Sequence, residues 1–151
     1  MEVGAVGRKD RDGQTPMHLA AKGGHIEVVR MLLGAHAPVN IFDYGGQTPL
    51  ILAAKKGRVG VVKESLQANA NVNSADKDGR TALSWASEIG AVDVIEELLS
   101  SRADIRIKDR HGKTALNYGH KTEVEEKPRK EKGATGPRML KLLNFARKPR
   151  K

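Results

Sequence analysis

The sequence predicts an all-α fold, a solenoid in which turn–helix–turn–helix units stack into one curved array. The stretch DRDGQTPMHLAA, which starts at Asp10, returns from Asp43, Asp76 and Asp109, so each copy lies 33 residues after the last. A glycine and a threonine keep the same register in all four copies. Hydrophobic residues make up only 38% of the chain and aromatic residues 3%. That composition suits units that bury their faces against neighbouring units rather than in one large core.

Each unit begins with a turn and a first helix. An Asp-x-x-Gly segment predicts the turn, because glycine adopts backbone angles that other residues resist. In the first copy Thr15 follows as the expected N-cap, and Pro16 takes the first helical position. The small residues Ala20 and Ala21 indicate close stacking against the next unit. Gly24 is expected to end the helix.

The second helix of each unit carries an apolar pattern with the helical period. The pattern consists of Val28, Val29, Leu32 and Leu33, then Val61, Val62 and Leu66, then Val94, Ile95, Leu98 and Leu99. Ser65 interrupts it, because a leucine stands at this place in the neighbouring copies. The sequence therefore predicts a packing defect at Ser65, with a hydroxyl that must bond back to its own helix.

These features together resemble the ankyrin repeat. The T-P-L-H signature of that family stands here as Thr15-Pro16-Met17-His18, and the match spans roughly residues 10–120. The glycine typical of the loop after the second helix is replaced by His36, Asn69 and Arg102. The resemblance implies an ankyrin-repeat solenoid with three complete repeats, followed by an irregular fourth. The predicted repeats are residues 10–42, 43–75, 76–108 and 109–147.

Both ends of the array depart from the repeat. Residues 1–9 resemble the end of a preceding repeat, so either Met1 is native and repeat 1 caps the stack, or the chain was cut there. In repeat 4 a polar segment, about residues 123–136, interrupts the pattern as an insertion of 12 residues. The apolar pattern then recovers, which predicts a docked helix over residues 138–147. Residues 148–151 form a basic tail.

No group of residues in the sequence predicts catalysis or metal binding. The chain has no cysteine, and its histidines do not have the spacing of a metal site. The resemblance gives His18 a structural role, in which it bonds to neighbouring backbone and braces the turn. Trp85 aligns with first-helix positions and is expected in the core rather than as a ligand platform. We therefore expect a non-enzymatic protein without a cofactor, a metal or a small-molecule substrate.

The resemblance implies that a partner binds to the concave face, which consists of the turn tips and the exposed ends of the first helices. Nine of the positions that carry over are Lys or Arg and three are acidic, so this face is expected to be basic. The exposed aromatics Phe42 and Tyr44 flank one turn and resemble a binding hot spot. The alternative is a solvated charged surface that has no partner. The predicted partner-binding residues are Arg11, Asp12, Gln14, Lys22, Phe42, Tyr44, Gln47, Lys55, Lys56, Lys77, Asp78, Arg80, Glu88, Ile89, Lys108, Arg110, His111 and Lys113.

The net charge of +9 lies mostly in the last part of the chain. Residues 121–151 hold 11 Lys or Arg and 4 Glu, a balance of +7, which leaves +2 for residues 1–120. This tail permits three interpretations: a capping helix with solubilising lysines, a nuclear import or nucleic-acid segment, or an amphipathic helix on an anionic membrane. The sequence predicts a monomer in the cytoplasm or nucleus that binds an acidic or phosphorylated protein segment. The alternative is polyanion binding, to nucleic acid or acidic lipid, through the tail.

Overall fold

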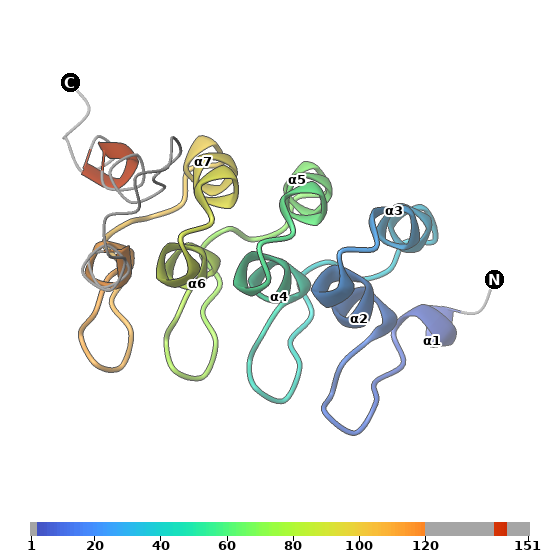
Figure 1. Ribbon diagram of the computed structural model, residues 1–151. Helices are drawn as coiled ribbons and strands as arrows, with labels where there is room; N and C mark the ends of the chain where they lie inside the picture. Colours follow the sequence, from blue (N-terminus) through green and yellow to red (C-terminus); the bar gives the residue numbers. More distant parts are fainter. Residues whose placement is uncertain (1–2, 120–140, 145–151) are drawn as a thin grey trace.

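Pairs of short antiparallel helices, each preceded by a long hairpin loop, repeat along the chain. The computed structural model describes residues 3–119 and 141–144, and over these residues the protein is an all-α solenoid (Figure 1). A single-turn helix, α1 (Val3–Val6), precedes the first pair. The three pairs are α2 (Pro16–Gly23) with α3 (Ile26–Gly34), α4 (Pro49–Lys55) with α5 (Val59–Gln67), and α6 (Ala82–Ile89) with α7 (Val92–Ser100). Residues 115–119 are also helical and continue the row of first helices.

The helices form two layers. The inner layer contains α2, α4 and α6, and the outer layer contains α3, α5 and α7 (Figure 1). Helices of seven to nine residues are too short to be stable alone, so the stacking of neighbouring units must hold them. The hairpin loops project side by side from the inner layer, all in one direction.

Small residues let the inner helices approach closely. Ala21, Ala53 and Ala54 are fully buried, and Ala86 occupies the equivalent place on α6. The outer layer contributes larger apolar side chains to the same core, among them Val61, Val62, Val94, Ile95 and Leu98. Trp85 only packs against the edge of this core and is partly buried, so the expectation of a core tryptophan needs correction.

Ser65 is buried among these outer-layer residues, with 1% of its surface exposed. Its Oγ has no hydrogen-bond partner among the described residues. The expected burial is therefore confirmed, but the expected bond back to the helix is absent. The three residues that replace the loop glycine, His36, Asn69 and Arg102, all adopt left-handed backbone angles, with φ of 59°, 64° and 65°.

The ends of the stack differ from its middle. Residues 3–6, in the segment that resembles the end of a preceding repeat, form α1, and Val6 packs against the core. Leu19 and Val28 are exposed on repeat 1, whereas the equivalent Leu52 and Val61 are buried. Residues 141–144 are helical and Leu143 is fully buried, which agrees with the predicted docked helix at these positions. The rest of the predicted helix over 138–147, the insertion at 123–136 and the tail at 148–151 lie outside the described residues.

Candidate functional site

The hairpin loops form a row that backbone hydrogen bonds tie together. In each loop the aspartate side chain accepts two backbone N–H groups of its own turn, as Asp43 Oδ1 does from Gly45 (2.9 Å) and Gln47 (2.8 Å). Neighbouring tips are joined by Tyr44 N–H to Asp12 O (3.0 Å), Lys77 N–H to Gly45 O (3.1 Å) and Arg110 N–H to Asp78 O (2.9 Å). The tips therefore present their side chains from a fixed backbone.

Phe42 and Tyr44 are both exposed on the second hairpin, at 47% and 59% of their surface. The Tyr44 ring lies directly against Gly13, where an added Cβ would fall 2.6 Å from Tyr44 Cδ1. Lys9 Nζ donates to Phe42 O (2.9 Å) and lies 5.8 Å from the centre of the Tyr44 ring. Because Asp43 fixes the turn between them, the two aromatic residues form a held, solvent-facing pair, here called the aromatic pair.

His18, on α2, bonds to the backbone of both the first and the second hairpin. The Thr15 N–H donates to His18 Nδ1 (3.1 Å), so the ring proton lies on Nε2 and donates to Gln47 O (2.9 Å). Burial is the largest influence on His18 and lowers its pKa below the ordinary value, although the bond to Gln47 opposes this effect. A neutral histidine with both nitrogens bonded is a structural brace, as the sequence predicts.

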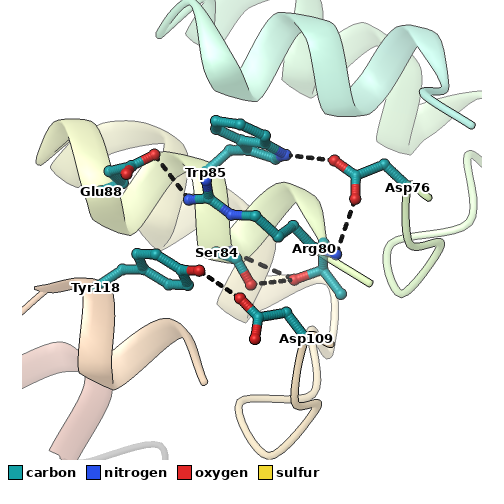
Figure 2. A network of polar contacts seen from close by, with 8 residues as sticks. Asp76, Arg80, Ser84, Trp85, Glu88, Asp109 and Tyr118 are labelled. Atoms are coloured by element: carbon teal, nitrogen blue, oxygen red, sulfur yellow. Dashed lines mark hydrogen bonds and ion pairs between the residues drawn. The ribbon is translucent and has the colours of Figure 1, made fainter. Parts of the chain in front are cut away.

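Repeat 3 contains a dense polar network around Arg80 (Figure 2). The Arg80 guanidinium lies 3.5 Å from the centre of the Trp85 ring and 4.0 Å from that of Tyr118, and its Nη2 pairs with Glu88 at 2.7 Å. Trp85 Nε1–H donates to Asp76 Oδ2 at 2.9 Å. Arg80 is only 9% exposed, so the expectation of a partner-binding arginine on the surface needs correction. Its charge is used inside the protein, because stacked aromatics and a carboxylate already surround it.

Tyr118 extends this network to the fourth hairpin by donating its hydroxyl to Asp109 Oδ2. Burial, helped by this bond, raises the pKa of Tyr118 to about 12. Arg80, Trp85 and Tyr118 therefore pack together at the interface between repeats 3 and 4. The ion pair with Glu88 already neutralises the charge of Arg80.

A family model described as ankyrin repeats (three copies) matches residues 3–76 and again residues 60–124. The chain belongs to the ankyrin repeat family. No match to the chain was found among curated proteins. Ankyrin repeats generally mediate contacts between proteins and are typically non-enzymatic modules. The hairpin row and the inner helices of this ankyrin stack are therefore where a partner is to be sought.

Most residues predicted for partner binding lie at the surface of the ankyrin stack. Gln14, Gln47, Lys55 and Glu88 are partly buried, and Arg80 is buried. Arg110 and Asp78 are exposed but pair with each other at 3.1 Å. The exposed members are Arg11, Asp12, Lys22, Phe42, Tyr44, Lys56, Lys77, Asp78, Ile89, Lys108, Arg110, His111 and Lys113.

Arg58 is a surface cation that the sequence reasoning missed. It lies just after the turn that ends α4, and its Nε–H donates to Lys22 O (3.3 Å) of the preceding repeat. The equivalent positions hold His25 and Ala91, neither of which is a lysine or an arginine, so alignment on the repeat gave no reason to select Arg58. The signal available was composition, because Lys55, Lys56 and Arg58 place three cations within four positions.

Among residues 3–119 and 141–144, no three metal-ligating side chains come together. None of the described helices has the length and apolar character needed to cross a membrane.

Proposed function

We propose that this ankyrin stack is a non-enzymatic binding module that, as a monomer, holds an acidic segment of another protein against repeats 1 and 2. The observation that carries the proposal is the aromatic pair, Phe42 and Tyr44, held exposed by a hairpin whose backbone is bonded on both sides. Exposed aromatic side chains on a fixed backbone lose little conformational entropy when they bind, which is typical of interface hot spots.

The charges beside the aromatic pair favour an acidic segment. Lys22 and Lys56 are exposed and Lys55 is partly buried, all on the inner helices that follow hairpins 1 and 2. Repeat 3 offers Glu88 and Ile89 at the positions of Lys55 and Lys56, and its Arg80 is buried. At these helix-end positions the positive charge is therefore confined to repeats 1 and 2, the repeats on either side of the aromatic pair.

A pull-down from extract with the full chain tests the proposal. The Phe42→Ala/Tyr44→Ala variant should lose the captured partner. Val28→Ala/Met31→Ala removes two equally exposed apolar side chains from the outer helix α3 and should retain it. Retention of the partner by the aromatic variant would contradict the proposal.

The same experiment addresses polyanion binding through the tail. Truncation would remove the buried Leu143, so Lys148→Gln/Arg150→Gln/Lys151→Gln is the better variant. If this variant abolishes binding while Phe42→Ala/Tyr44→Ala leaves it intact, the tail is the binding element and the proposal is wrong. A cytoplasmic or nuclear location is also part of the proposal, and imaging of a tagged full chain would test it.

A further inference from the structure

Four cations gather where the first two inner helices end. Lys22 lies in the last turn of α2, Lys55 lies in the last turn of α4, and Lys56 and Arg58 follow in the turn after α4. Lys22, Lys56 and Arg58 are exposed and Lys55 is partly buried. We call these four residues the helix-end cluster.

The cluster crosses the boundary between repeats 1 and 2. The Arg58 side chain reaches back to donate to Lys22 O at 3.3 Å and lies over Gly24, where an added Cβ would come 2.8 Å from Arg58 Cδ. Lys55 Nζ is held 4.2 Å from the centre of the Trp85 ring. Helices α2 and α4 pack side by side in the inner layer (Figure 1), and all four residues lie at or just after the C-terminal ends of these two helices.

No carboxylate compensates this charge in the part of the chain that the structure describes. The ion pairs there involve Arg30, Lys63, Arg80, Arg106 and Arg110, and none of the cluster residues. The favourable field at a helix C-terminus accounts for a cation in the last turn, which covers Lys22 and Lys55. The C-cap residue Lys56 benefits from the same field, but Arg58, at the N-cap of α5, does not. Positive charges that no ion pair offsets favour binding of an external anion.

The chemistry of the cluster distinguishes between anions. Among the described residues Arg58 uses Nε–H alone in a hydrogen bond, which leaves the N–H groups of its two terminal nitrogens for a ligand. A carboxylate carries one negative charge on two oxygens, whereas a phosphate monoester carries about −1.5 to −2 charges and three strong acceptor oxygens. An arginine fork together with the three lysines of the cluster matches the phosphate better in both charge and donor number.

We propose that the helix-end cluster binds the phosphate of a phosphorylated serine or threonine in the protein partner. The inference rests on the proposed function, because the same partner would contact the aromatic pair. Helix α4, with seven residues, spans about 10 Å, and the hairpin with the aromatic pair projects beyond its start, so the two contacts lie at least about 10 Å apart (Figure 1). An extended partner therefore needs at least about three residues between its apolar anchor and its phosphorylated residue.

The test uses the full chain and a degenerate phosphoserine peptide pool, with the unphosphorylated pool and inorganic phosphate as separate arms. Trp85 is the only tryptophan in the sequence and Lys55 covers its ring, so its fluorescence reports an anion that contacts Lys55. The phosphorylated pool should bind at least ~10-fold more tightly than the unphosphorylated pool, the effect of charge-assisted hydrogen bonds.

The variants locate the binding. Lys56→Gln/Arg58→Gln should lose this preference, whereas Lys63→Gln/Lys141→Gln, which removes two exposed lysines outside the predicted partner-binding residues, should keep it. Because Arg58 also bonds to the end of α2, Lys22→Gln/Lys56→Gln leaves that bond in place and should weaken binding by itself. Equal binding of both peptide pools, or equal loss in the control variant, would overturn the inference. So would inorganic phosphate that binds as tightly as the phosphorylated pool.

Phosphatase treatment of the partner captured in the pull-down separates this inference from the proposed function. A partner that binds equally well after treatment, and still requires Phe42 and Tyr44, would refute the phosphate site and leave the proposed function standing. Loss of capture after treatment is the expected result.

Discussion

Removal of the buried hydroxyl at Ser65 should stabilise the protein. A buried polar group without a partner costs about 1–3 kcal/mol, and Ser65 Oγ has none among the described residues. Alanine adds about 0.5 kcal/mol of helix propensity. Ser65→Ala should therefore raise the free energy of unfolding by about 1–3 kcal/mol, a shift of about 2–12 °C in melting temperature for a stack of this size.

Ser65→Leu tests the packing defect as well as the hydroxyl. If a void lies beside Ser65, the leucine buries additional apolar surface and gains up to about 2 kcal/mol more than alanine. If the surroundings have collapsed, overpacking costs about 1–3 kcal/mol and leucine falls below alanine. The sequence pattern, with leucine at this place in both neighbours, predicts the first outcome.

Urea denaturation is the assay, because a shift of the midpoint at constant slope isolates a change in stability. Ser100→Ala is the matched control, since it makes the same change at an exposed helical position of α7. A stability gain at Ser65 no larger than the gain at Ser100 would refute the unsatisfied hydroxyl as its cause.

Three further perturbations test other parts of the structure. Arg80→Gln should destabilise the protein by about 1–3 kcal/mol, because it leaves Glu88 unpaired and uncovers the Trp85 ring. Amide hydrogen exchange should then become faster at residues 115–119. Unchanged exchange there would contradict the role of Arg80 between repeats 3 and 4. Leu143→Ala should lower the free energy of unfolding, measured by urea denaturation, by about 2–4 kcal/mol because Leu143 is fully buried. Lys141→Ala, at an exposed position, should change it little. Equal effects of the two substitutions would contradict docking of residues 141–144. The folded pKa of Tyr118, about 12, lies above its unfolded value, so its contribution to stability is complete below about pH 10 and is lost as pH rises toward 12. Tyr118→Phe should remove this loss in denaturation measured against pH, and an unchanged pH profile would show that another group causes it.

The sequence was sufficient for the fold because the repeat constrains each unit in the same way. The register of the hairpin aspartates and N-cap threonines predicts turn and helix start together, and His18 shows how one signature residue joins two units. The left-handed residues His36, Asn69 and Arg102 follow from the same register, since the backbone at that loop keeps its shape when glycine is replaced.

What the sequence could not predict depends on long side chains that also contact a neighbouring repeat. Alignment places Arg80 at a surface position, yet Trp85 and Tyr118 from two helices enclose it. Arg58 lies outside the repeat signature, and its side chain donates a hydrogen bond to the Lys22 backbone of the preceding repeat. In both cases a long side chain contacts a neighbouring repeat, and the 33-residue sequence pattern does not predict such contacts.

The kinetics of partner binding test the central claim most directly. With the partner from the pull-down immobilised, Phe42→Ala/Tyr44→Ala should weaken binding by about 2 kcal/mol or more, chiefly through a faster off-rate, because aromatic anchors hold the formed complex. Lys55→Glu/Lys56→Glu should instead slow association and reduce its dependence on salt, because these charges act during approach. Unchanged rates in both variants, together with loss of binding when Lys148, Arg150 and Lys151 are neutralised, would contradict binding on the hairpins and inner helices of repeats 1 and 2.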